Sequence, residues 1–262
     1  MTRAPRWAAA AVVAAAWVGA CTDVGTAPDA IVAIAFDSLP YPSVVAGDTM
    51  RDSAGRAAPL TAVAYNTSGS VIANPSIRYL SLDTGVDIGP QGYLVATTRT
   101  GGTVRVVAAA ATLQSLTRTV VVTHPPTLLA ASGATDSTLK YDSPDRPTNV
   151  GPPMTVKLTR DSAGVSVGVP GFLVSWQATF HGTVVAKADT TASFWTDASA
   201  RVASAVDTTA ADGTAARSLR IRTNTLPATD SFFVYASVKY RGAAVAGSPV
   251  KFVIHFRPKA AR

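Results

Sequence analysis

The sequence contains no glutamate, because all 16 acidic residues are aspartate. Glutamate is a good helix former, whereas aspartate favours turns, so this absence counts against a helical fold. Cys21 is the only cysteine in 262 residues, which excludes a disulfide within the chain. The three histidines, His124, His181 and His255, are scattered. A zinc site needs clustered Cys, His, Asp or Glu ligands, and no such cluster is visible in the sequence.

Long apolar runs are also lacking, apart from residues 7–18 near the start. This run is too short for a transmembrane helix, which needs roughly 20 apolar residues. Arg3 and Arg6 precede the run, and the small residues Gly19 and Ala20 follow it. This order is typical of a secretory signal peptide, which we place at residues 1–20.

The residues Val18, Gly19, Ala20 and Cys21 resemble the bacterial lipobox. That resemblance implies cleavage before Cys21 and diacylation of its sulfur; the alternative is an ordinary signal peptide followed by a chance cysteine. Two or more acyl chains anchor a protein stably to a bilayer. We therefore expect an exported lipoprotein anchored in a bacterial membrane, with the outer membrane or cell surface favoured. Residues 21–29 have little to bury and are expected to be a flexible tether.

The chain is rich in valine and threonine and contains 19 glycines and 17 prolines, a composition typical of short strands and turns. Alternating apolar residues predict about seven strands in the first half and a second set from residue 154 onward, with glycine- and aspartate-containing turns between them. The predicted strands are 31–36, 44–45, 60–65, 71–72, 77–82, 93–97, 103–110 and 116–123, then 154–158, 172–177, 192–195, 201–206, 218–222, 231–240 and 249–256. No helical periodicity is convincing after the leader, so the chain is predicted to be all-β, with sandwiches or barrels.

The pair Pro125-Pro126 ends the first set, since proline cannot donate a hydrogen bond to a sheet. We therefore predict a first domain at 30–124 and a second at 151–258. Residues 125–150 are polar and rich in turn residues, and we interpret them as a linker; a long first loop of the second domain is the alternative. Trp176 alternates in phase with Phe172 and Val174, which indicates a core position.

Short motifs in both halves resemble bacterial immunoglobulin-like domains. In the first half, the segments that resemble intimin-type domains are Ile31–Ile34, Val45–Thr49, Leu60–Val63, Asn66–Gly69, Gly101–Val104 and Thr119–Val122. Tyr79 stands where the family often has tryptophan. In the second half, the segments that resemble invasin-type domains are Met154–Leu158, Asp161–Gly164, Gly168–Gly171, Val174–Trp176 and Ala210–Ala215. The resemblance implies two tandem antiparallel immunoglobulin-like β-sandwiches, used as spacers, adhesive modules or surface accessories, with no shared catalytic residues.

Two motifs resemble catalytic motifs but are better explained as parts of strands and turns. Ser166 lies in a Gly-x-Ser-x-Gly pattern, but a nucleophile elbow needs a following helix, and here Pro170 and a strand follow. Ser137 and Lys140 fit Ser-x-x-Lys without the partner motifs of serine penicillin-binding enzymes. We expect a protein that is not an enzyme and has no cofactor. A hydrolase with an unrecognised aspartate-based site remains an alternative.

Two charged groups suggest binding. Asp136, Asp142 and Asp145 crowd the predicted linker and could hold calcium, which takes oxygen ligands in flexible loops; turn chemistry explains them equally well. Five basic residues lie on or beside neighbouring predicted strands and could meet anionic sugars, lipopolysaccharide or phospholipid headgroups; the alternative is a solvated sheet face. These residues, which we call the basic stripe, are Arg217, Arg220, Arg222, Lys239 and Arg241.

These features together favour a non-enzymatic, lipid-anchored envelope protein that acts as a spacer or as an adhesive or binding module. The expected partners are the membrane, through the N-terminal lipid, and an envelope glycan or surface protein. A carbohydrate- or envelope-polymer-binding module is the first alternative. Nucleic acid is not expected as a partner of an exported protein, and we expect a monomer.

Overall fold

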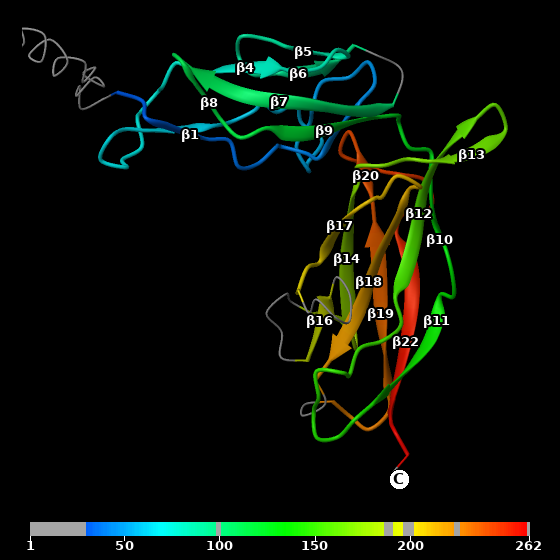
Figure 1. The fold of residues 1–262 in the computed structure, drawn as a ribbon. Coiled ribbons are helices and arrows are strands. Elements are labelled where there is room, and N and C mark those ends of the chain that lie inside the picture. The colour runs from blue at the N-terminus through cyan, green and yellow to red at the C-terminus, as the bar shows by residue number, and fades with distance from the viewer. Residues whose placement is uncertain (1–29, 98–100, 186–190, 196–201, 223–225, 261–262) are drawn as a thin grey trace, which may run out of the picture.

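The computed structural model describes residues 30–97, 101–185, 191–195, 202–222 and 226–260. Every regular element within these ranges is a β-strand, and the strands form two sandwiches that meet at a bend (Figure 1). The all-β class and the two tandem sandwiches predicted from the sequence are confirmed.

The first sandwich is built on one main sheet and two small ones. The main sheet has the order β2 (Ser43–Val45), β9 (Arg118–Thr123), β7 (Gly102–Ala110) and β4 (Arg78–Ser81), with β8 (Leu113–Gln114) paired to β7. The small sheets pair β1 (Ala33–Ala35) with β3 (Val63–Tyr65), and β5 (Val86–Ile88) with β6 (Leu94–Ala96).

The core of the first sandwich follows from alternation along its strands. Val104 and Val106 of β7 are buried, while Arg105 between them is exposed, as the two-residue period of a strand requires. The same alternation puts Val120 and Val122 of β9 inside. The remaining buried members of this cluster are Phe36, Val44, Met50, Leu60, Val86, Leu94, Ala96 and Ala108.

The second sandwich has two larger sheets. One contains β10 (Leu128–Ala131), β12 (Met154–Ser162), β18 (Thr214–Ile221) and β16 (Ala192–Trp195) in that order, with β13 (Val165–Gly168) on β12. The other contains β11 (Asp136–Tyr141), β22 (Val250–Pro258), β19 (Asp230–Ser237), β14 (Leu173–Phe180) and β15 (Thr183–Val184), with β17 (Val206–Thr208) on β14. A short hairpin joins β20 (Lys239–Tyr240) to β21 (Ala243–Ala244).

Aromatic side chains fill the second core. Trp176 is buried between Phe194 and Phe252, with ring centroids 6.5 and 6.0 Å away, so its predicted core position is confirmed. Phe232 and Phe256 pack 5.5 Å apart on adjacent strands. Aromatic side chains bury large apolar surfaces, so these contacts contribute strongly to the stability of the second core.

Between the strands that the structure describes, pairing is antiparallel with two exceptions. β2 runs parallel to β9 in the first sandwich, with Val44 opposite Val122. β11 runs parallel to β22 in the second, with Leu139 opposite Phe256. In each sandwich an early strand is therefore hydrogen-bonded beside the last strand.

The interpretation of residues 125–150 as a linker is wrong. Thr127 already donates its backbone N–H to Thr159 O (2.8 Å), and β10 and β11 follow as strands of the second sandwich. Leu129, Leu139 and Tyr141 are buried in the second core. These few apolar residues lie between turn-forming aspartate, glycine and proline, which is why the sequence pattern hid two strands.

The predicted strand at 201–206 is also corrected. Arg201 lies outside the described residues, and Ala203 makes only an isolated bridge with Trp195. The strand in this region is β17, which begins at Val206 and pairs with β14.

Candidate functional site

Cys21 and the lipobox residues Val18, Gly19 and Ala20 lie outside the described residues, so their prediction stays a prediction. Among the described residues, no helix is long and apolar enough to cross a membrane.

The basic stripe does not form one surface. Arg217 and Arg220 are each only 6% exposed, so the alternative of a solvated sheet face is wrong for both. Arg222 is exposed at the end of β18. Lys239 and Arg241 lie elsewhere, on and beside the β20–β21 hairpin. Alternation along β18 predicted outward side chains, but loops fold over that face and cover it.

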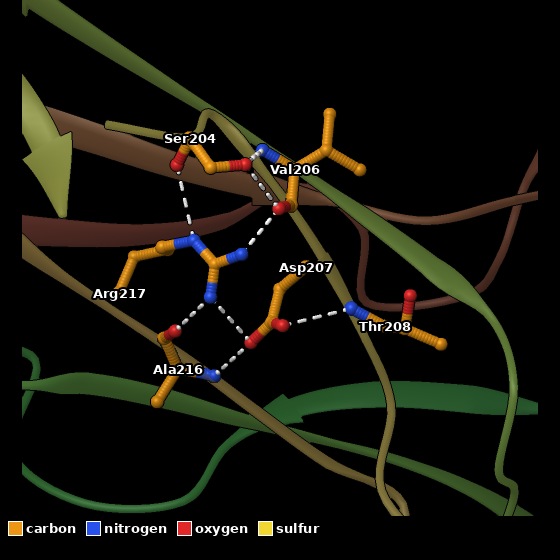
Figure 2. A network of polar contacts seen from close by, with 6 residues as sticks. All are labelled: Ser204, Val206, Asp207, Thr208, Ala216 and Arg217. Carbon is orange, nitrogen blue, oxygen red and sulfur yellow. Dashed lines mark hydrogen bonds and ion pairs between the residues drawn. The ribbon is translucent and has the colours of Figure 1, made fainter. Parts of the chain in front are cut away.

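Arg217 is enclosed by a network of backbone and side-chain oxygens (Figure 2). Its Nε donates to Ser204 O (3.0 Å), one terminal nitrogen donates to Ala216 O (2.8 Å), and the other donates to Val206 O. Asp207 Oδ2 lies 2.8 Å from the guanidinium and also accepts from the Ala216 amide (2.9 Å). A buried charge is tolerated only when it is paired and hydrogen-bonded. Arg217 therefore braces the 204–207 segment and is not a ligand-binding group.

Arg220 braces a second loop. Its Nη2 lies 2.7 Å from Asp145 Oδ2, and Nη1 donates to Ile221 O. Its guanidinium carbon is 5.8 Å from the centroid of the Trp195 ring, close enough for a cation–π contact. The 142–149 loop is thus fixed against β18.

The three aspartates predicted as a weak calcium site do not converge. Asp142 pairs with Lys259 at 2.7 Å, Asp145 pairs with Arg220, and Asp136 lies 3.3 Å from His255. Among the residues that the structure describes, no group of three His, Cys, Asp or Glu side chains is placed to hold a metal ion. The predicted location is also wrong: Asp136 is the first residue of β11, a strand of the second sandwich, and β11 lies away from the bend (Figure 1).

The joint between the sandwiches is centred instead on Asp48, which is 9% exposed. Its carboxylate accepts from Arg51 Nε and Nη2 (3.1 and 3.0 Å) and from the Thr49 amide (2.9 Å), all within the first sandwich. From the second sandwich, Arg241 Nε donates to the same carboxylate at 2.9 Å. Burial alone would raise the pKa of Asp48, but the hydrogen bonds from Arg51, Arg241 and Thr49 lower it to about 2.

Two further hydrogen bonds cross the joint. Leu173 N donates to the Tyr41 hydroxyl oxygen (2.9 Å), and Ser43 Oγ donates to Gly171 O (2.8 Å). Burial raises the pKa of Tyr41, whose ring packs edge-on against Phe172 with centroids 6.0 Å apart. Side chains from both sandwiches therefore form one continuous packed interface.

Two glycines allow the backbones to meet. A Cβ on Gly55 would lie 2.1 Å from Gly242 N, and one on Gly171 would lie 2.7 Å from Ser43 Cβ. Gly55 and Gly171 also have φ of +86° and +80°, a conformation that costs other residues energy. Val45 of β2 even belongs to the core of the second sandwich. Such close contact indicates a fixed joint and not a flexible hinge.

A row of three polar side chains, of which the sequence analysis singled out only Asp136, crosses the outer face of the second sandwich. Ser231 Oγ lies 2.6 Å from His255 Nδ1, and His255 Nε2 lies 3.3 Å from Asp136 Oδ1. The row arises because Ser231 pairs with His255 across β19 and β22, and β11 is the next strand. No local signal reveals this, since the three positions are far apart in the sequence.

Neither catalytic-looking motif gains support. Ser166 lies in β13, a hairpin partner of β12, and no helix follows it. Ser137 and Lys140 both lie along β11.

The two sandwiches define an all-β pair of immunoglobulin-like domains. No protein-family model and no curated protein matches the sequence. Similar solved structures include the Yersinia pseudotuberculosis adhesin InvE, at 12% identity and a TM-score of 0.34 over 82% of this chain and 56% of that one. The D0-D1 domain of intimin is similar at 14% identity and a TM-score of 0.27, over 85% of this chain and 98% of that one.

The S-layer protein rSbsC is similar at 15% identity and a TM-score of 0.30, over 85% of this chain and 27% of that one. The chain therefore spans about half the length of the adhesin and about a quarter of the S-layer protein. These neighbours include the intimin- and invasin-type proteins whose domains the sequence resembles. The fold itself rests on the sheets and cores of the two sandwiches.

Proposed function

We propose that this chain is an exported, lipid-anchored cell-envelope protein whose two sandwiches form a bent, non-enzymatic spacer that presents a binding surface. The sequence Val18-Gly19-Ala20-Cys21 carries the anchoring part of the proposal. A chain tethered by lipid at one end holds its domains next to the membrane. The packed joint around Asp48 supports the spacer role, because it holds the second sandwich at a set angle to the first.

The anchoring is tested by replacing Cys21 with serine in the full-length chain. We expect the wild-type protein to incorporate an alkyne-tagged fatty acid and to sediment with membranes, and the C21S variant to lose both properties. Thr22→Ser is the matched control and should behave as the wild type. Membrane retention of C21S would overturn the anchoring.

Surface display is tested separately by adding protease to intact cells. Loss of the folded domains is expected if they face outward. Survival of the protein on intact cells, with digestion after lysis, would remove the adhesive role and leave a spacer that faces the periplasm.

A hydrolase is the second candidate function, favoured only by the row of Ser231, His255 and Asp136. A serine is activated by an adjacent histidine base that a carboxylate orients. In this row His255 and Asp136 are 48% and 69% exposed. Efficient transition-state stabilisation needs water-excluded, preorganised donors, and this open face supplies water instead.

The test is labelling of the purified protein with a fluorophosphonate probe, which reacts with activated serines. We expect no labelling of the wild type above that of Ser231→Ala. Labelling that depends on both Ser231 and His255 would establish the hydrolase and overturn the non-enzymatic proposal.

A further inference from the structure

A small, partly open cavity of about 40 Å³ lies at the joint. A water molecule needs roughly 10–15 Å³ of such volume, so the cavity has room for about three. Its walls come from both sandwiches: Tyr41, Asp48 and Arg51 from the first, and Phe172, Tyr240 and Arg241 from the second. A group of a few heavy atoms fits inside, and the body of any larger ligand would lie outside.

The charges around the cavity favour an anion. Arg51, Lys239 and Arg241 line it, against Asp48 and Asp52. Asp52 is already paired with Arg56 at 2.9 Å. Asp48 is therefore left to balance three cationic groups.

The donors suit an oxyanion. Arg51 donates Nε and Nη2 to Asp48 and Nη1 to Gly55 O (2.9 Å), whereas Arg241 donates to Asp48 through Nε. A guanidinium presents its donors in a fork that matches carboxylate and phosphate oxygens. Lys239 is exposed and makes no ion pair with any described residue. Arg51 and Arg241 are positioned by Asp48, so the site is preorganised before a ligand arrives. The Tyr240 ring, 5.4 Å from the Arg241 guanidinium carbon, adds the aromatic wall that is common in ligand pockets.

We propose that the cavity between Arg51, Lys239 and Arg241 binds the oxyanion group, carboxylate or phosphate, of an acidic sugar unit of an envelope polymer. The oxyanion sits between the guanidinium groups and Lys239, and the sugar ring lies against Tyr240 at the mouth. The proposed anion site makes the binding role proposed above more specific. It includes two of the five residues of the basic stripe, Lys239 and Arg241. The choice of a sugar rests on the proposed envelope location, whereas the anion site does not depend on it.

The test is thermal unfolding of the full-length protein in a non-ionic detergent at constant ionic strength. The probes are glucuronate, glucose 6-phosphate and neutral glucose. At about ten times Kd an anionic sugar should raise Tm by roughly 3–6 °C, and glucose should not. A rise with glucuronate alone assigns a carboxylate ligand, and a rise with the sugar phosphate alone assigns a phosphate ligand.

The Lys239→Ala variant tests whether the ligand binds in this cavity. It leaves the joint intact, because Arg241 keeps its hydrogen bond to Asp48. We expect Kd to increase about fivefold, the effect of one exposed charge. Lys140→Ala, an exposed lysine on β11, is the matched control and should leave Kd unchanged. No rise in Tm with either anionic sugar, an equal rise with glucose, or a Kd unaffected by Lys239→Ala would each overturn the proposal. Since the purified protein is measured, these failures are distinct from failure of the Cys21 anchor.

Discussion

Replacing Asp48 with asparagine should weaken the joint in a way that depends on pH. Asparagine keeps the size of the side chain and one acceptor oxygen but removes the charge that Arg51 and Arg241 share. A pKa of about 2 in the folded protein, against 3.8 ordinarily, corresponds to about 2 kcal/mol of stability at neutral pH. The urea midpoint of the variant should therefore fall by about 1 M at pH 7.

The sign of the pH dependence follows from the direction of the shift. Because the folded-state pKa of Asp48 is depressed, its contribution is complete above about pH 5 and is lost as the pH falls toward 2. The difference between wild type and D48N should shrink to about half by pH 3. Hydrogen bonds from Arg105 also lower the pKa of Asp83 to about 2. Only the difference between the two proteins, and not the wild-type curve alone, isolates Asp48.

The measurement is urea unfolding followed by tryptophan fluorescence at pH 7, 5, 4 and 3. Asp37→Asn is the matched control, since Asp37 is 82% exposed and meets Arg118 only at 3.4 Å. Exposed pairs of this kind contribute little, so its midpoint should equal that of the wild type. Equal stability of D48N and wild type at pH 7, or a difference that is the same at pH 7 and pH 3, would refute the role assigned to the Asp48 carboxylate.

Three other changes have defined outcomes. Gly55→Ala should open the bend and enlarge the radius of gyration in small-angle scattering, because the added Cβ would overlap the backbone of Gly242 in the second sandwich. Gly69→Ala is the control: Gly69 has a similar φ of +76°, but no atom lies within 4 Å of an added Cβ. This control should lose only about 1–2 kcal/mol of stability through backbone strain. Arg217→Ala should destabilise the chain by about 3–5 kcal/mol in urea unfolding by leaving Asp207 unpaired, and an unchanged midpoint would contradict the network of Figure 2. Tyr141→Phe should cost about 1 kcal/mol in the same assay, since the hydroxyl donates to a backbone carbonyl at 2.9 Å; a loss beyond about 3 kcal/mol would mean that the ring itself had moved.

The strands that the sequence predicts well are those with sustained alternation. Phe232, Val234 and Ala236 of β19 are all buried, as their period of two requires. Prediction from alternation failed where a strand has few apolar residues and is surrounded by turn residues, as in β10 and β11. It also failed for Arg217 and Arg220, because alternation assigns a face of a strand but does not show that a loop covers that face.

The joint was beyond prediction for a different reason. Asp48 and Arg241 are 193 positions apart, and each lies in a turn whose residues are explained locally. Nothing in either segment indicates its partner. Lys239 and Arg241 were selected from the sequence as possible binding residues, but Arg51 and the acidic group that positions it were not. Tertiary contact, and not local pattern, assembles this site.

The two parallel strand pairs have a mechanical consequence for a chain pulled between its ends. In each sandwich the early strand is drawn toward the N-terminus and the last strand toward the C-terminus: β2 against β9, and β11 against β22. Parallel neighbours loaded in this way slide past one another, so the hydrogen bonds along each pair resist together instead of opening one by one. The strands that precede β2 and β11, namely β1 and β10, pair with β3 and β12 and would carry part of the load. A tether that ended in such domains would transmit tension between a membrane and a bound polymer without losing its folded shape at the first pull.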